Sequence, residues 1–220
     1  MRIYISARTR LWLALAGSSL VSVILFLANV HTTHSWEFAY LNWNLFLAWT
    51  PLFFTFWLMK VLQRKLWSSW EALLVTVIWL SFLPNSFYMI SDFVHILDVP
   101  PSRVLYLVVV FASFIFNGVI LGYLSLFQVH QELLQRLSKR TAALLVAVVL
   151  ALCSFAIYLG HDLRWNSWDV LRDPGGILVD ISNHITDAIA YTTAFSFFIL
   201  LGSLYIVVWY TARNMRQHKA

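Results

Sequence analysis

Charged residues are scarce in this sequence. Asp, Glu, Lys and Arg make up 11% of the 220 residues, whereas 60% are hydrophobic. A soluble globular domain carries about 25% charged and about 45–50% apolar residues, so the composition excludes a chain that is mainly soluble. The long apolar runs do not alternate as the strands of a membrane barrel do, and lipid cannot hydrogen-bond free backbone groups. The sequence therefore predicts an all-α membrane protein.

Cysteine and extended basic regions are also lacking. Cys153 is the single cysteine, which excludes an intramolecular disulfide. The net charge of +5 comes from small groups of Lys and Arg between apolar segments. That distribution is typical of a membrane protein's topology signal rather than of nucleic-acid binding. We expect membrane lipids as partners and no nucleic acid.

Six apolar segments are long enough to cross a bilayer, which needs about 20 helical residues. They cover residues 11–30, 43–62, 72–90, 104–127, 142–160 and 188–210. The first is too long for the apolar region of a signal peptide, so we expect it to be retained as a helix. The sequence predicts a single transmembrane domain over residues 1–220, an integral membrane bundle of about six transmembrane helices.

The basic residues predict which helix ends face the cytoplasm. Twelve of the fifteen lie at the N-terminus, in the second and fourth connections and in the tail: Arg2, Arg8, Arg10, Lys60, Arg64, Lys65, Arg136, Lys139, Arg140, Arg213, Arg216 and Lys219. Arg103, Arg164 and Arg172 lie in the opposite connections. The positive-inside rule therefore predicts that both termini lie in the cytoplasm.

Acidic residues and histidines show the opposite distribution. Most of them fall on the predicted outer side: Glu37, Asp92, Asp98, Asp162, Asp169, Asp173, Asp180, Asp187, His31, His34, His95, His161 and His184. This excess suggests that any chemistry faces outward.

A polar stripe is predicted at the outer end of the third helix. At 100° per residue its members fall within an arc of roughly 80°: Ser81, Asn85, Tyr88, Asp92 and His95. Pro84 lacks a backbone donor, and we expect it to kink the helix. A polar face that begins inside an apolar span must point at protein or water. It is either a hydrogen-bonded seam between helices or the wall of a pocket.

The outer segment 161–169 carries a second polar group. Asn166 or Ser167 can cap a short helix with Asp169 in its first turn, which requires no binding function. Arg164 is an outer cation that suits a carboxylate or phosphate partner. We predict that it contacts Asp92 and Asn85, directly or through a bound anion.

A third polar group precedes the last span. Its members lie within about 60° of one another on a helix and predict a short amphipathic outer helix: Asp180, His184, Asp187 and Tyr191. A divalent metal is a possible cofactor, with a candidate ligand set formed by Asp92, His95, Asp180, His184 and Asp187. No compact metal motif is present, so a solvated helix face is the alternative.

Other polar and small residues lie within the spans. Asn117, Gly118 and Gly122 predict close packing of the fourth helix. Asn44 and Pro51 on the second helix are more typical of packing than of a site. No Asp, Glu, Lys or Arg lies deep in a span, which argues against an ion-coupled transporter.

Three segments together resemble a known family. They are WNLFLAWTP at residues 43–51, LPNSFYMISDFVH at residues 83–95 and YLGHDLRWNSWDVL at residues 158–171. They resemble an uncharacterised family of bacterial polytopic membrane proteins, classed as a domain of unknown function. The resemblance supplies no activity. It implies a bacterial inner-membrane protein with an outward polar site built from Pro84, Asn85, Tyr88, Asp92, His95, Arg164, Asn166, Ser167, Trp168 and Asp169.

These patterns leave several functions open. The leading hypothesis is an outward polar pocket that binds a lipid headgroup, a cell-envelope intermediate or a metal ion. The pocket residues are Asn85, Tyr88, Asp92, His95, Arg164, Asn166 and Asp169. A small-solute or ion transporter would need polar residues through the whole bilayer. A membrane-embedded enzyme would use Asp92 and His95 for acid–base chemistry or as ligands, and an assembly or scaffold protein would not need the pocket. The sequence does not decide among these classes.

Overall fold

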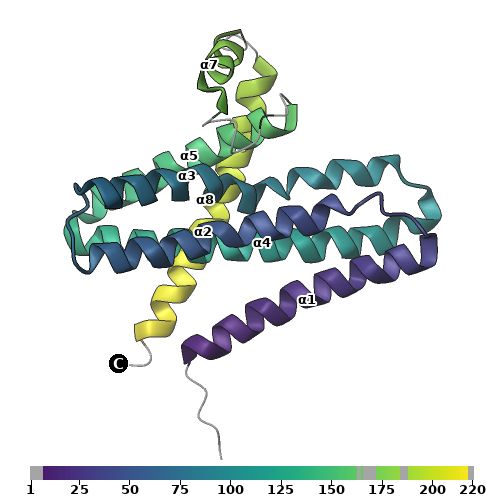
Figure 1. The fold of residues 1–220 in the computed structure, drawn as a ribbon, viewed down its shortest axis with the longest axis horizontal. Helices are drawn as coiled ribbons and strands as arrows, with labels where there is room; N and C mark the ends of the chain where they lie inside the picture. The colour runs from purple at the N-terminus through teal and green to yellow at the C-terminus, as the bar shows by residue number, and fades with distance from the viewer. Residues whose placement is uncertain (1–6, 163–164, 166–171, 184–187, 218–220) are drawn as a thin grey trace, which may run out of the picture.

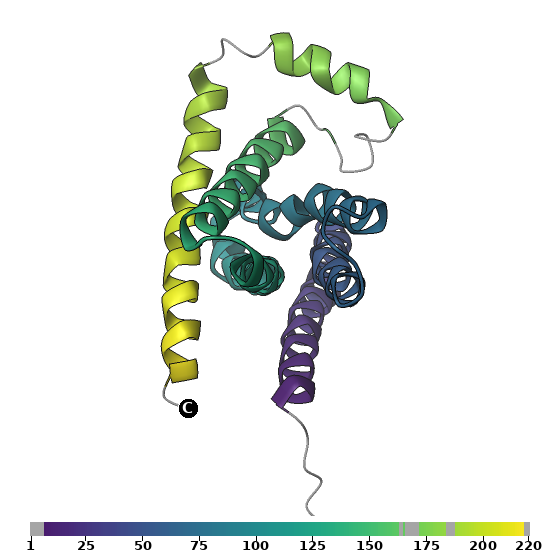
Figure 2. The same cartoon turned by 90° about the vertical axis from the view of Figure 1, so that its left-hand side faces the viewer.

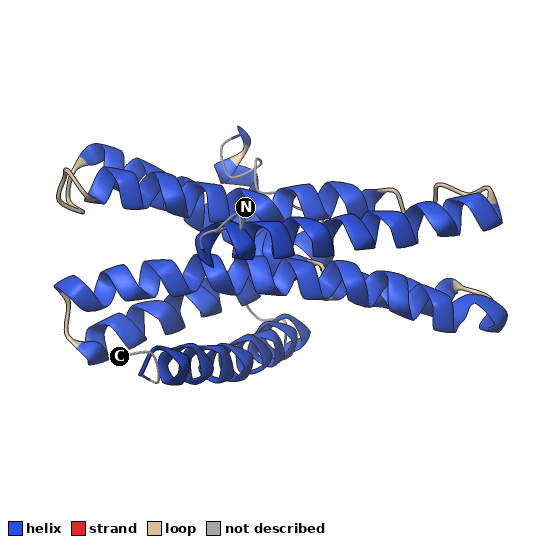
Figure 3. Ribbon diagram, turned by 90° about the horizontal axis from the view of Figure 1, so that it is seen from below, coloured by secondary structure: helices blue, strands red, loops and turns tan. Residues whose placement is uncertain are grey.

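The structure is a computed structural model that describes residues 7–162, 165, 172–183 and 188–217. Within this part of the chain, all regular structure is helical, and short loops join the helices (Figure 3). The elements are α1 (Ala7–Thr33), α2 (Tyr40–Leu62), α3 (Trp70–Tyr88), the 3₁₀ helix η1 (Ser91–Asp98), α4 (Pro101–Arg136), α5 (Lys139–Asp162), α7 (Pro174–Asn183) and α8 (Ala188–Gln217).

Six helical segments among the described residues are long and apolar enough to cross a membrane, which confirms the predicted number. They are Thr9–Thr33, Tyr40–Leu62, Trp70–Leu97, Pro101–Arg136, Lys139–His161 and Ala188–Asn214. Each contains one of the predicted apolar runs. The fourth continues well past the predicted end at residue 127, because residues 128–136 extend the same α-helix beyond the apolar run.

The helices form a bundle with one steeply crossing member. α2, α3 and α4 lie side by side along the long axis of the molecule (Figure 1). α1 packs on α4, and α5 packs on both α3 and α8. α8 crosses the direction of α2–α4, and α7 lies beyond the end of α5 (Figure 2).

Successive helices in the bundle run in opposite directions. The connections 62–70 and 136–139 lie at one end of α2–α4, and the connections 33–40 and 88–101 lie at the other (Figure 1). The first end carries the basic groups at residues 60–65 and 136–140. Which end faces the cytoplasm stays a prediction from these charges.

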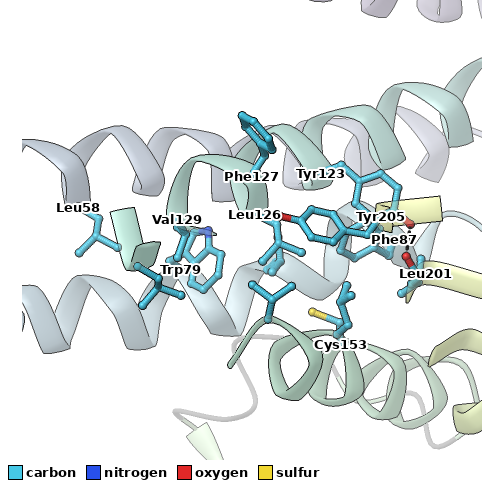
Figure 4. Close-up of a cluster of buried hydrophobic side chains, with 14 of the residues drawn as sticks. Leu58, Trp79, Phe87, Tyr123, Leu126, Phe127, Val129, Cys153, Leu201 and Tyr205 are labelled. Atoms are coloured by element: carbon cyan, nitrogen blue, oxygen red, sulfur yellow. Dashed lines mark hydrogen bonds between the residues drawn. The ribbon is translucent and has the colours of Figure 1, made fainter. Parts of the chain in front are cut away.

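Two clusters of buried apolar side chains hold the bundle together. One lies where α3, α4, α5 and α8 meet, around Trp79, Phe87 and Cys153 (Figure 4). There the Tyr123 hydroxyl donates a 2.8 Å hydrogen bond to the carbonyl oxygen of Leu201, which joins α4 to α8. The other cluster lies between α1, α2 and α4.

Small residues on α4 allow α3 to approach closely. A Cβ atom on Gly118 would lie 2.6 Å from the carbonyl oxygen of Ser86, and one on Gly122 would lie 2.8 Å from the Phe87 ring. Asn117, on the same helix, donates a 3.0 Å hydrogen bond to the Ser22 hydroxyl of α1. These contacts confirm the predicted packing role of this part of α4.

The helices α3 and α7 bear on the predicted kink at Pro84 and on the predicted amphipathic helix. α3 continues as an α-helix through Pro84 to Tyr88, and the winding then tightens into η1 from Ser91. The predicted amphipathic helix over 180–191 corresponds in part to α7, which ends at Asn183. α8 begins at Ala188, and the residues between them lie outside the described part, so a continuous polar face there stays a prediction.

Candidate functional site

A cavity of about 580 Å³ lies between α2, α3, η1 and α5. Its polar lining includes the whole predicted stripe and two residues of α2: Ser81, Asn85, Tyr88, Asp92, His95, Tyr40 and Asn44. The apolar lining comes from α2, α3 and α5, with Trp165 beyond the end of α5. The members of the stripe therefore line one cavity, and Asp92 also takes part in a hydrogen bond between helices. That the stripe serves as a binding pocket stays a prediction.

Asp92 is the most buried charged group at the cavity. It is 3% exposed and lies in the first turn of η1. The Asn44 side-chain amide donates a 3.0 Å hydrogen bond to its Oδ2 atom. A buried carboxylate is costly unless it is hydrogen-bonded or paired with a cation, so α2 supplies a contact that the carboxylate of η1 requires.

The role of Asn44 was not predicted, because a single amide in an apolar helix is typical of packing. One feature of the sequence nevertheless indicated a role for Asn44. Asn44 lies within the segment 43–51, which is part of the family resemblance, and a buried amide must find a partner. Sequence periodicity does not say which helix provides that partner.

Tyr40 is a second site residue that sequence reasoning missed. Its side chain lines the cavity, and its ring packs edge-on against the His95 imidazole with 5.6 Å between centroids. The hydroxyl oxygen is buried and has no hydrogen-bond partner among the described residues. A buried hydroxyl without a partner is unfavourable, and a water or a ligand group beside it would remove that cost.

The α5 side of the cavity is closed by contacts with Tyr88 and Trp165. The Tyr88 hydroxyl donates a long hydrogen bond, 3.5 Å, to the carbonyl oxygen of Gly160. A Cβ atom on Gly160 would lie 3.0 Å from the Tyr88 ring, so glycine allows α5 to come this close. The Trp165 indole nitrogen donates a 2.8 Å hydrogen bond to Oδ2 of Asp180, which ties α7 to the cavity wall.

The predicted pocket is described only in part. Asn85, Tyr88, Asp92 and His95 line one cavity, with the His95 side chain exposed and the Asn85 amide donating to the Phe82 carbonyl oxygen at 3.0 Å. The remaining predicted pocket residues, Arg164, Asn166 and Asp169, lie outside the described residues. The predicted contact of Arg164 with Asp92 and Asn85 therefore stays a prediction. In the described part, the two ion pairs are Lys65–Glu71 and Arg136–Glu132, and neither lines this cavity.

The metal hypothesis gains no support from the described residues. No three His, Cys, Asp or Glu side chains among them lie close enough together to hold a metal ion. Asp92 and Asp180 accept hydrogen bonds from Asn44 and Trp165 instead. His184 and Asp187, two of the five candidate ligands, lie outside the described part, so a site that includes them stays a prediction.

The side of α3 away from the cavity packs in the apolar cluster. Trp79, Leu83 and Phe87 of α3, on the side away from the cavity, are buried in the apolar cluster. Within that cluster the Trp79 indole nitrogen and the Thr55 hydroxyl both bond the Ser125 hydroxyl at 2.7 Å. These buried polar groups therefore satisfy one another within the bundle.

The chain matches the model of a known protein family. The model of DUF1361, described as a protein of unknown function, matches residues 43–207. This range includes all three segments on which the resemblance rested. Neither the comparison with curated proteins nor that with solved structures finds a match. The match covers most of the chain, and the chain therefore belongs to the DUF1361 family.

Proposed function

We propose that this member of the DUF1361 family, a multi-pass membrane protein, binds the polar headgroup of a lipid in the cavity between α2, α3 and α5. The observation that carries the proposal is the buried Asp92 carboxylate, held by Asn44 at the cavity wall. Asn44 occupies Oδ2, and Oδ1 has no side-chain partner among the described residues. A ligand that donates a hydrogen bond to this carboxylate gains strength because the surroundings are dehydrated.

The aromatic lining favours an ammonium group as the donor. Tyr40, Trp43, Tyr88 and Trp165 line the same cavity as Asp92. Aromatic faces attract cations through their quadrupole, and cages of this kind recognise ammonium ligands. A headgroup that carries a primary amine, as in phosphatidylethanolamine, combines a cation with three hydrogen-bond donors.

The rest of the cavity suits the apolar part of a lipid. Leu47, Leu80 and Ala156 line it alongside the polar residues. Two further lining residues, Trp43 and Leu152, are about half exposed, so the cavity adjoins the apolar outer surface of the bundle. Its volume lies within the range of about 300–1,000 Å³ that is usual for ligand sites. The described polar lining is confined to the second half of α3, η1 and the start of α2, which favours binding over transport.

The test compares lipid binding by the full-length protein and by Asp92→Asn. Native mass spectrometry of detergent-purified protein would be titrated with dioleoyl phosphatidylethanolamine and, separately, with dioleoyl phosphatidylglycerol. We expect Asp92→Asn to weaken phosphatidylethanolamine binding about tenfold, because a charge-assisted hydrogen bond contributes about 1.5 kcal/mol or more.

Glu37→Gln is the matched control, because Glu37 is an exposed acid that does not line the cavity. It should bind phosphatidylethanolamine as the unmodified protein does. Equal binding of phosphatidylethanolamine by Asp92→Asn and by the unmodified protein would contradict the proposal. So would a loss of phosphatidylglycerol binding in Asp92→Asn as large as its loss of phosphatidylethanolamine binding.

A further inference from the structure

A second cavity, of about 370 Å³, lies where the end of α4, the start of α5 and the end of α8 come together. It is at the end of the bundle opposite η1, where the basic connections lie. The first cavity shares none of its lining residues. The two sites are therefore independent.

Two cations from different helices line the second cavity. Lys139 begins α5, and Arg213 lies near the end of α8. Both side chains are exposed, and neither forms an ion pair within the described part of the chain. No Asp or Glu is among the described residues that line this cavity. Glu132, an acid of the same stretch of α4, is held by Arg136 at 2.8 Å.

The inner wall of this cavity is fixed in place. His130 is 6% exposed, and its Nδ1 atom shares a 2.9 Å hydrogen bond with the Tyr205 hydroxyl. Its ring stacks on Trp209 with 4.0 Å between centroids. This arrangement leaves Nε2 as the ring nitrogen without a partner among the described residues. The cavity thus combines two exposed cations with an aromatic and imidazole wall that is held by hydrogen bonding and stacking.

The composition of the lining identifies the ligand class. Lys and Arg together suit a phosphate, Arg through its planar fork and Lys as a point charge. Phe127, Leu134 and Trp209 supply an apolar surface next to the cations. Basic pockets between membrane helices near a leaflet surface bind anionic lipid headgroups. A phosphate attached to acyl chains matches both the cations and the apolar surface of the lining.

We propose that the second cavity binds the phosphate of an anionic phospholipid, with Lys139 and Arg213 as its cationic ligands. The bound lipid links α5 to α8 at the end of the bundle where the basic connections lie. Binding therefore stabilises the attachment of α8, which reaches the rest of the bundle chiefly through α5.

The experiment uses the full-length protein in neutral detergent with three probes: dioleoyl phosphatidylglycerol, dioleoyl phosphatidylcholine and inorganic phosphate. Native mass spectrometry measures bound lipid, and thermal unfolding measures stabilisation. Phosphatidylglycerol should bind more tightly than phosphatidylcholine and raise the unfolding temperature, whereas phosphate alone should leave that temperature unchanged. Lys139→Gln/Arg213→Gln should weaken phosphatidylglycerol binding about thirtyfold, because each cation contributes about 1 kcal/mol near an anionic surface.

Lys60→Gln/Arg64→Gln is the matched control. It removes two exposed cations from the same end of the molecule, neither of which lines the cavity. It should keep the preference for phosphatidylglycerol. The proposal is overturned if the control loses the preference as the cavity variant does, or if the cavity variant keeps it. Stabilisation by inorganic phosphate equal to that by phosphatidylglycerol would show a free-anion site and reject the lipid.

Discussion

Asn44 and Asp92 form the polar contact on which the candidate site depends. The Asn44→Ala change would remove the amide that donates to Oδ2 and leave a carboxylate that is 3% exposed without this partner. We expect a loss of about 1–3 kcal/mol in the free energy of unfolding, the usual cost of a buried polar group left unsatisfied. Asn42→Ala is the control, because the Asn42 side-chain amide bonds the backbone carbonyl of Ala39, close by in the chain. Equal effects of the two changes in thermal or chemical unfolding would contradict a special role for Asn44.

Arg164 is the residue whose predicted contact bears most directly on the charge of the site. If its guanidinium pairs with Asp92 in a dehydrated setting, removing either partner costs about 3–5 kcal/mol. Arg164→Ala and Asp92→Ala should each lower the stability of the purified protein, and the double variant should lose much less than their sum. Strictly additive losses would rule out the pair. Without that pair, Arg164 would not compete with an ammonium ligand for the Asp92 carboxylate.

At the scale of the helices, the α3–α4 contact depends on the absence of side chains at two positions of α4. Gly118→Ala would place a Cβ atom 2.6 Å from the Ser86 carbonyl oxygen, and Gly122→Ala one 2.8 Å from Phe87. Each change should cost about 1–3 kcal/mol, because an overpacked contact forces the helices apart. Gly202→Ala on α8 meets nothing within 4 Å and should be neutral or slightly stabilising. Thermal unfolding of the three variants in one detergent would measure these differences. Equal stability of all three variants would contradict the close α3–α4 contact.

Helix periodicity was enough to predict the polar stripe, but not its partners. Tyr88, Asp92 and His95 follow one another at spacings of three and four residues. Spacings of three keep side chains on one face in a 3₁₀ helix as well as in an α-helix, so the change of winding at Ser91 left the stripe intact. Tyr40 and Asn44 were missed as site residues, because α2 is apolar nearly all round and its own pattern does not say which neighbour it meets.

At the scale of the whole molecule, the apolar runs predicted the six spans because length and hydropathy alone define a membrane helix. The steep crossing of α8 was beyond prediction (Figures 1 and 2). Helix crossing angles depend on side-chain ridges in three dimensions. The Tyr123–Leu201 and His130–Tyr205 contacts that hold α8 join residues more than 70 positions apart, which no local pattern predicts.

The topology prediction is tested by labelling from outside the cell. Single cysteines at positions 64, 139 and 216, in a Cys153→Ala background, should be protected from an impermeant thiol reagent in intact cells. A cysteine at position 172 should react. All four should react once the membrane is permeabilised, which is the control for folding and exposure. Labelling at 139 without labelling at 172 in intact cells would reverse the predicted orientation.

An experimental density map would decide whether the cavity beside Asp92 holds a lipid headgroup. The full-length protein would be imaged by electron cryomicroscopy in nanodiscs of phosphatidylethanolamine, with Asp92→Asn prepared in parallel. We expect headgroup density in the cavity of the unmodified protein, with the amine within about 3.2 Å of the Asp92 carboxylate, and its loss in Asp92→Asn. A cavity filled by protein side chains, or the Arg164 guanidinium against Asp92 with no lipid beside it, would contradict the proposal.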